Sequence, residues 1–352
     1  MTEYSVGRAD FGDWGVVMKS DTQTRANPFN IRWLGAAAGA ALSLAPVCAY
    51  AGDAPSPYSI PLRAPPANGY LYPGASFFSS WLDMVSATQK AQPRWMTPLV
   101  TVTPRLEQEF RWDFYDQKNG TGPQGNGQNI ITYGGPGGAR LEFIPAYDWE
   151  VIVAAPSWAT ASGPRGKAEG WADWPAFLVK YRLLSANAEN GDYIVTAFFQ
   201  MSDPLGTPGN ISNNVLTAQP TLAFGKGWGD FDIQSTISVQ IPVDGIQSAN
   251  FTAQQNVTRF GDPILWNTAF QYHFAEYFWP ELEVNYTYWP NGIHTGLSQV
   301  LLTPGIIFGR FKIGQDTPTR PINLIIGAGY QFAVTSDPVV KNNWVATLRV
   351  TF

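Results

Sequence analysis

The chain is poor in cysteine, histidine and charge. Among its 352 residues it has one cysteine, Cys48, and two histidines, and charged residues make up 14%, against about 25% in a typical soluble domain. A single cysteine excludes a disulfide framework. The formal net charge of -5 excludes the basic footprint of a nucleic-acid-binding protein. No apolar run beyond residue 51 is long enough for a membrane-spanning helix.

The two histidines offer little for catalysis or metal binding. His273 lies in a predicted strand without a suitable serine beside it, and His294 lies in a predicted loop near Ser298. Neither arrangement fits a serine, histidine and acid triad, and no histidine or cysteine cluster suggests a transition-metal site. The turn-rich stretch 203–210 lacks the Gly-Lys-Ser/Thr ending of a phosphate-binding loop. We expect no catalytic residue, no metal and no cofactor.

The N-terminal region has the pattern of an export leader. An apolar, small-residue-rich stretch, Trp33–Val47, follows two arginines and precedes Ala49-Tyr50-Ala51, an A-x-A cleavage site. This pattern predicts a signal peptide over residues 1–51, with Met18 as an alternative start. Cys48 raises the option of a lipoprotein, but the residues before it make a poor lipidation motif.

Residues 52–97 form a second region. Residues 52–75 are rich in Pro, Gly and Ser, which indicates an extended linker. Apolar residues then recur at helical spacing from Phe77 through Trp81 to Val85. This spacing predicts a short amphipathic helix over residues 76–92 that ends before Pro93.

From Pro98 the apolar period changes to two, and residues 98–352 are predicted to form an all-β, antiparallel domain. Twelve strands are expected: 98–115, 139–147, 149–158, 173–185, 192–202, 214–225, 230–242, 263–274, 278–289, 299–311, 321–333 and 343–352. Their connections alternate in length: tight turns after residues 147, 186, 226 and 275, a middling one at 311–320, and long polar stretches between. Outer-membrane barrels have even strand numbers, short periplasmic turns and long outer loops, and only closed sheets satisfy their backbone groups in lipid. We therefore predict a twelve-stranded transmembrane β-barrel.

Alternation assigns the charged strand residues to the barrel interior, because a charge facing lipid costs about 2–4 kcal/mol at mid-membrane. The residues expected to line the lumen are Arg105, Glu107, Glu109, Arg111, Arg140, Glu142, Lys180, Arg182, Gln234, Glu281, Glu283 and Arg349. They form either a salt-bridge network that fills the interior or a charged path for a solute. The near balance of acids and bases favours the filling network.

Four glycines share the inward face of two neighbouring predicted strands: Gly305, Gly309, Gly327 and Gly329. Small residues leave space on that wall. We expect the space to admit either a solute or the helix 76–92, which would bury Phe77 and Trp81 there.

The final predicted strand alternates from Trp344 to Phe352 and resembles the closing strand of bacterial outer-membrane barrels. In those proteins the terminal Phe is recognised by the barrel-assembly machinery, which this resemblance makes an expected partner through Phe352. The other expected partners are outer-membrane lipid and lipopolysaccharide, and the barrel is expected to be a monomer.

Several short motifs occur in a familiar order. Gly170-Trp171-Ala172-Asp173-Trp174 leads into the strand Phe177–Tyr181; a second strand, Tyr193–Met201, precedes a Pro-Leu-Gly-Thr-Pro-Gly loop, and Gly227-Trp228-Gly229-Asp230 follows. This order is similar to the MetA-pathway phenol-degradation type of outer-membrane transporters, over roughly residues 97–352. The resemblance implies an outer-membrane barrel that moves hydrophobic or aromatic compounds. We therefore expect passive uptake of a small hydrophobic or aromatic solute. A non-conducting structural or adhesive barrel is the alternative, and a membrane enzyme comes third.

Overall fold

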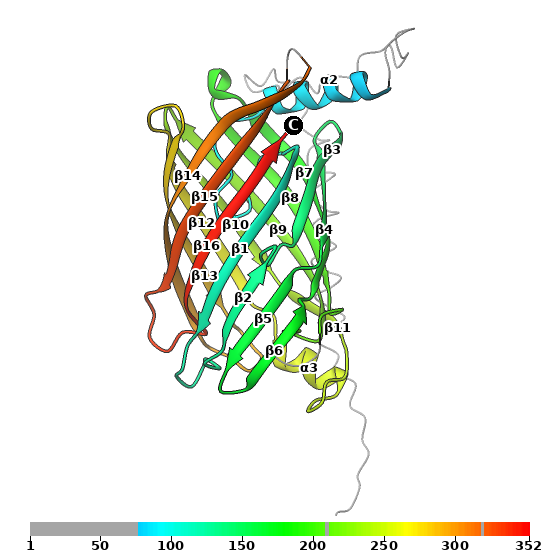
Figure 1. Ribbon diagram of the computed structural model, residues 1–352, viewed down its shortest axis with the longest axis vertical. Coiled ribbons are helices and arrows are strands. Elements are labelled where there is room, and N and C mark those ends of the chain that lie inside the picture. Colours follow the sequence, from blue (N-terminus) through cyan, green and yellow to red (C-terminus); the bar gives the residue numbers. More distant parts are fainter. Residues whose placement is uncertain (1–76, 208–210, 318–319) are drawn as a thin grey trace, which may run out of the picture. The chain divides into compact units, whose positions relative to one another are not determined.

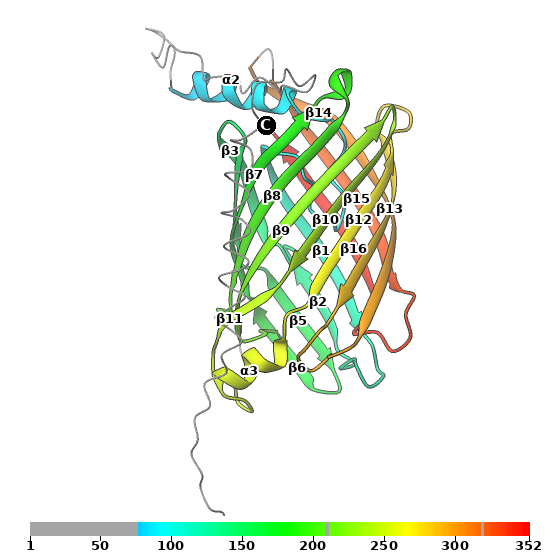
Figure 2. The same ribbon diagram turned by 180° about the vertical axis from the view of Figure 1, so that it is seen from behind.

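The computed structural model describes residues 77–207, 211–317 and 320–352, all within the compact unit Leu71–Phe352. The predicted leader 1–51 and linker 52–75 lie outside these residues. The described chain is a closed antiparallel barrel of twelve strands, preceded by one helix, α2 (Phe77–Lys90) (Figures 1 and 2). No helix in this part of the chain is long and apolar enough to cross a bilayer.

Four of the twelve barrel strands are interrupted and carry two labels each. In chain order the strands are β1 (Glu109–Asn119), β2 (Asn129–Tyr133) with β3 (Ala139–Ala146), β4 (Trp149–Ala155) with β5 (Trp158–Gly163), β6 (Gly166–Trp171) with β7 (Trp174–Ala186), β8 (Tyr193–Asp203), β9 (Val215–Trp228), β10 (Phe231–Val239) with β11 (Ile241–Gly245), β12 (Ile264–Tyr272), β13 (Phe278–Tyr288), β14 (Ser298–Thr317), β15 (Arg320–Ala333) and β16 (Val340–Thr351). Pairing of β16 with β1, with Arg349 opposite Arg111, closes the sheet. The break between β2 and β3 falls on a Gly-Gly-Pro-Gly-Gly run in which Gly135 has a φ of 69°, a conformation that favours glycine.

The two ends of the barrel differ as the sequence predicts. Tyr147–Asp148, residues 187–192, Gly229–Asp230 and residues 273–277 connect strands at one end. Longer loops connect them at the other end. One of these loops carries a helix that was not predicted, α3 (Ala253–Phe260), whose start is stabilised by a capping box. Short turns mark the periplasmic end of such barrels. Helix α2 and the C-terminal end of β16 lie at that end (Figure 1).

Three predicted boundaries are wrong. The first strand begins at Glu109 rather than at residue 98, because residues 91–108 run through the barrel interior without strand structure. Residues 311–317 are strand and not part of a turn, since β14 extends to Thr317. The predicted long stretch 159–172 contains the hairpin β5–β6, which turns between Gly163 and Gly166, both at positive φ.

The outer face of the barrel is apolar along its middle. Exposed side chains there are Phe110, Leu141, Val153, Phe177, Leu183, Phe199, Leu222, Ile237, Leu282, Ile326 and Leu348. Exposed aromatic side chains form a belt at each end: Trp149, Tyr181 and Trp228 near the short turns, and Tyr133, Trp158, Trp171, Trp266 and Trp344 near the long loops. Two further aromatics near strand ends, Tyr115 and Trp279, are buried inside the barrel and do not belong to the belts. The outer surface matches the lipid-facing band and aromatic girdles of membrane barrels.

Candidate functional site

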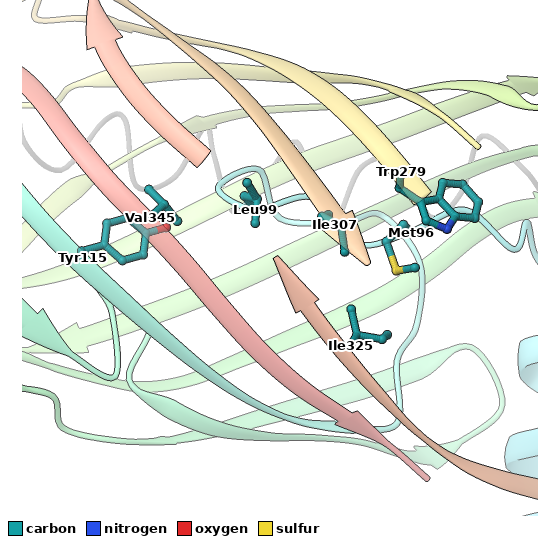
Figure 3. Close-up of a cluster of buried hydrophobic side chains, with 7 residues drawn as sticks. All are labelled: Met96, Leu99, Tyr115, Trp279, Ile307, Ile325 and Val345. Carbon is teal, nitrogen blue, oxygen red and sulfur yellow. The ribbon is translucent and has the colours of Figure 1, made fainter. Parts of the chain in front are cut away.

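The barrel lumen is occupied by residues 91–108, which we call the plug. The plug connects α2 to β1 and makes no β-ladder with the wall. Its contacts reach inward-facing side chains of strands on opposite sides of the barrel, from Lys180 on β7 to Glu283 on β13. Figure 3 shows this loop inside the ribbon of the barrel. The wall is therefore complete without the plug, which is held by wall side chains and, at its last residue, by a backbone hydrogen bond from Phe352 N–H to the Gln108 carbonyl at 3.1 Å.

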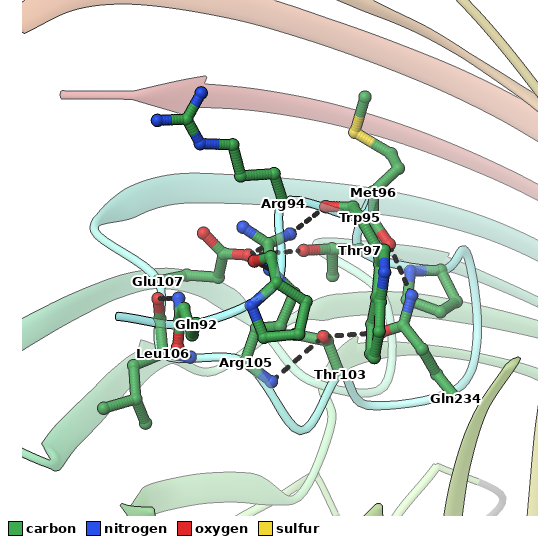
Figure 4. A network of polar contacts seen from close by, with 12 residues as sticks. Gln92, Arg94, Trp95, Met96, Thr97, Thr103, Arg105, Leu106, Glu107 and Gln234 are labelled. Atoms are coloured by element: carbon green, nitrogen blue, oxygen red, sulfur yellow. Dashed lines mark hydrogen bonds and ion pairs between the residues drawn. The ribbon is translucent and has the colours of Figure 1, made fainter. Parts of the chain in front are cut away.

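The plug is closed at its base by a pair of reciprocal hydrogen bonds. The side-chain amide of Gln92 donates to the Leu106 carbonyl at 2.7 Å and accepts from the Leu106 N–H at 2.9 Å. Within the loop, Arg105 donates to the carbonyls of Pro93 and Trp95 and forms an ion pair with Glu107 at 2.9 Å. These contacts, shown in Figure 4, hold the two ends of the plug together.

One apolar side chain of the plug, Leu99, fills the space beside the inward-facing glycines of β14 and β15, which we call the glycine wall. A Cβ atom added at Gly305 would lie 2.5 Å from Leu99 Cδ1, and one at Gly329 would lie 2.8 Å from the same atom. Leu99 is fully buried in a cluster shown in Figure 3, whose members are Met96, Leu99, Tyr115, Trp279, Ile307, Ile325 and Val345. The space predicted on this wall thus exists, and Leu99 occupies it in place of the helix 76–92.

A second glycine pair receives the plug's tryptophan. Added Cβ atoms at Gly225 and Gly227 would both clash with the Trp95 indole. The indole Nε1 donates to Asp192 Oδ2 at 3.0 Å. Since Trp95 and Leu99 dock on strands in different parts of the wall, the plug is anchored on two sides.

The backbone of the plug is bound by charged wall residues. Carboxylates accept from its N–H groups: Leu99 N donates to Glu281 Oε1 at 3.1 Å, and the N–H groups of Val100 and Thr101 donate to Glu283 at 2.7 and 2.6 Å. Guanidinium groups donate to its carbonyls: Arg111 to Leu99 O at 2.7 Å, and Arg349 to the carbonyls of Thr97 and Pro98.

Further polar contacts fix the returning half of the plug. Lys180 pairs with Glu150 at 2.9 Å, and both side chains are fully buried. Lys180 also donates to Arg105 O at 3.2 Å, while Glu150 accepts from the Glu107 N–H at 2.5 Å. Buried ions are tolerated when they are paired and hydrogen-bonded. Here the plug backbone supplies the additional hydrogen bonds, through the Arg105 carbonyl and the Glu107 N–H.

The residues predicted to line the lumen are all inside the barrel, but they have different roles. Arg105 and Glu107 belong to the plug and not to a strand. The wall residues that contact the plug directly are Arg111, Lys180, Gln234, Glu281, Glu283 and Arg349. Arg140 pairs with Glu142 at 2.9 Å beside the buried Glu109. At the periplasmic end, Arg182 binds Asp148 and donates to the Thr88 carbonyl of α2.

Three other residues were predicted to lie at the solute path or the glycine wall: Phe77, Trp81 and Gly309. Trp81 of α2 donates to the Ile144 carbonyl at 2.7 Å, so it packs on β3 at the periplasmic end and not on the glycine wall. The side chain of Phe77 is outside the described part of the structure. An added Cβ at Gly309 would meet Ile325 and not the plug.

Sequence reasoning missed the plug because residues 98–108 keep an approximate period of two. Pro98 and Pro104 are the feature that could have identified it, since proline lacks the N–H that a central strand donates. The sequence does not indicate the inward positions of Tyr115 and Trp279, because an aromatic residue near a strand end fits a lipid-facing belt equally well.

The space beyond the plug differs at the two ends. Towards the long loops the inner wall is lined by uncharged amides, among them Asn285, Gln299, Gln331 and Asn343, and Gln331 donates to Asn285 at 2.9 Å. At the periplasmic end a cavity of about 280 Å³ remains between α2, the plug and β14–β16.

The histidines lie at opposite ends of the barrel. His273 stacks on Trp279 with ring centroids 4.1 Å apart, 3.8 Å from Asp230. His294 is hydrogen-bonded to Gln124 at 3.1 Å in the long loops. Among the described residues no group of histidine, cysteine and acidic side chains could hold a metal ion.

A closed, even-stranded antiparallel barrel with an apolar outer band and two aromatic belts is a transmembrane β-barrel of the bacterial outer membrane. No protein-family model matches the sequence, and no curated protein matches it.

Solved structures of similar architecture are outer-membrane proteins. An outer membrane channel from Pseudomonas putida F1 has a TM-score of 0.42 at 13% identity, covering 70% of this chain and 94% of that one. The NanC porin has a TM-score of 0.40 at 9% identity, covering 69% and 98%. The DcaP channel of Acinetobacter baumannii has a TM-score of 0.27 at 8% identity, covering 69% and 72%. These likenesses are low, and the class of the protein rests on its own geometry.

Proposed function

We propose that the protein is an outer-membrane channel that the plug closes, and that it passes a small solute when the plug is displaced. The observation that carries this proposal is that the wall closes through β1 and β16 without any ladder to the plug. Removing the plug from the lumen breaks no strand pairing and opens the interior of a twelve-stranded barrel.

The energetics of the wall support displacement. Arg349, Lys180 and Glu283 are fully buried behind the plug, and burial of ions carries a desolvation cost of several kcal/mol each. Water entering an open lumen would hydrate these groups. This hydration offsets part of the contact energy that is lost when the plug leaves. The free energy of opening is therefore smaller than the number of contacts suggests.

The apolar inner wall supports a solute with a hydrophobic or aromatic part. Leu99 and Met96 of the plug cover Tyr115, Trp279 and Ile307 on that wall. Displacing the plug would uncover these side chains to a solute. This fits the expectation drawn from the phenol-degradation type of transporter, which remains a sequence resemblance.

A reversible lock on the plug tests the proposal. In a full-length protein with Cys48→Ser, the pair Leu99→Cys and Gly305→Cys places thiols at two positions in direct contact, since the added Cβ lies 2.5 Å from Leu99 Cδ1; such contact is the condition for engineering a disulfide. We expect stepwise ion currents in planar bilayers after reduction and none after oxidation. The two single-cysteine variants are the controls and should conduct alike in both states.

Two results would contradict the proposal. Currents that are the same in the oxidised and reduced pair would show that ions bypass the plug. A folded, reduced protein that never conducts would favour the alternative, a structural or adhesive barrel.

A further inference from the structure

One residue of the plug is held at all three of its chemical groups. The N–H of Leu99 donates to Glu281 Oε1 at 3.1 Å, and its carbonyl accepts from Arg111 Nη2 at 2.7 Å. Its side chain fills the wall at Gly305 and Gly329. The wall thus places an acid, a base and an apolar hollow around a single α-amino acid unit.

The acidic side of this arrangement is built from two carboxylates. Glu281 and Glu283 are neighbours on the inward face of β13, and both are buried. Glu281 also accepts from Gln271 at 2.7 Å, which fixes its orientation. Between them the two side chains accept three consecutive backbone N–H groups, those of residues 99–101.

The basic side is built from two guanidinium groups on the paired strands β1 and β16. Arg111 is oriented by Asp113 at 2.9 Å and lies opposite Arg349 in the register. Their donors reach the carbonyls of Thr97, Pro98 and Leu99. Arg111 therefore contacts the carbonyl of Leu99 itself, whereas Arg349 contacts the carbonyls of the two residues before it. Glu281 accepts from the Leu99 N–H, and Glu283 accepts from the two N–H groups that follow the Leu99 carbonyl.

We infer that the plug occupies a solute site in the manner of a bound ligand, and that the site takes apolar α-amino acids or short peptides that contain them. This inference rests on the proposed channel function and adds the class of solute. In such a solute an ammonium group replaces the Leu99 N–H at Glu281, and a carboxylate replaces the Leu99 carbonyl at Arg111. Hydrogen bonds between two charged partners are stronger than those to a neutral amide. A free zwitterion therefore competes with the plug for the same wall groups.

The alternatives leave part of the site unused. A purely apolar solute would fill the hollow but would not replace the hydrogen bonds that Glu281 and Arg111 make to the Leu99 backbone, which is costly. A simple anion would satisfy the bases and face the two carboxylates. Only a solute with both charges and an apolar side chain matches all three parts.

Four related probes separate these cases. L-leucine has all three groups, 4-methylpentanoic acid lacks the amine, 3-methylbutylamine lacks the carboxylate, and glycine lacks the side chain. Each is added to full-length protein, and to a Leu99→Ala variant whose plug is loosened by lost packing while the wall stays intact, in planar bilayers. We expect L-leucine to modulate the ion current at a concentration at least about tenfold lower than any of the others, since each charged hydrogen bond is worth more than one decade in affinity.

A matched pair of variants assigns the effect to the wall. Glu281→Gln keeps an acceptor for the plug but removes the charge that faces the ammonium group, so the advantage of L-leucine over 4-methylpentanoic acid should fall to about twofold or less. Glu169→Gln, on the exposed outer side of β6, should leave that advantage unchanged.

The outcomes are distinguishable. Ion current with equal sensitivity to all four probes would overturn the solute class while leaving the channel function in place. A preference for L-leucine that persists in Glu281→Gln would also overturn it, because the site would lie elsewhere. Absence of current in both the full-length protein and Leu99→Ala would overturn the channel function itself.

Discussion

Substituting Gly305 by alanine should push the plug out of the lumen. The added Cβ would lie 2.5 Å from Leu99 Cδ1, while its next neighbours, Glu281 Oε1 and Ala328 O, are 3.3 and 3.4 Å away. Carbon atoms pack best at roughly 3.5–4.0 Å, so the overlap with Leu99 is about 1 Å and falls on the plug rather than on the wall.

Overpacking of this kind costs about 1–3 kcal/mol. Because the closed state alone contains the clash, this cost shifts the closed-to-open equilibrium by about 5- to 150-fold. The open probability of single channels in planar bilayers measures that shift. Gly314→Ala on the same strand is the matched control, since its Cβ meets only Ile322, at an ordinary 3.6 Å, and should leave the open probability unchanged.

A double-mutant comparison tests the physical cause. Leu99→Ala removes the atom that the new Cβ strikes, and by itself should loosen the plug through lost packing. In that background, Gly305→Ala should change the open probability by less than about twofold, because the two sites are coupled only through their contact. An equal effect of Gly305→Ala with and without Leu99 would refute the reasoning.

Two further predictions concern other contacts. Lys180→Met leaves Glu150 buried without its ion-pair partner at 2.9 Å, so the barrel should lose about 3–5 kcal/mol in the free energy of unfolding, measured in urea with detergent. Lys167→Met, at an exposed position of β6, is the control. Burial lowers the pKa of His294 from its ordinary value, so its neutral form is favoured in the fold, and the surrounding loops should lose stability as the pH falls below about 6.5 and the buried ring must take up a charge. Hydrogen exchange of residues 120–128, corrected for intrinsic rates, should rise on acidification in the wild type but stay constant in His294→Gln.

The sequence predicted the barrel because its evidence is local and repeated. Strands such as 278–289 alternate cleanly, so Glu281 and Glu283 face inward and Leu282 faces outward, as the alternation requires. Alternating loop lengths predicted which ends of the strands meet. Twelve strands and a helix near residues 77–90 follow from these patterns.

The plug could not be predicted in the same way, because its position depends on contacts between residues far apart in the chain. Leu99 meets glycines more than 200 residues away, and no local pattern records that fit. The glycine wall did indicate a cavity, but several occupants were compatible with it. Pro98 and Pro104 are evidence against a central strand, but the period of two among the residues around them indicated a strand more strongly.

The plug continues directly into β1 at Glu109, so its displacement cannot separate it from the barrel. Closing is therefore an intramolecular event, and a short tether gives the plug an effective concentration in the millimolar range at its own docking site. A free peptide copied from residues 91–108 would have to exceed that concentration to compete. The fraction of closed channels is accordingly independent of the number of protein molecules in the membrane. In each channel the plug can return to its own lumen without a partner molecule.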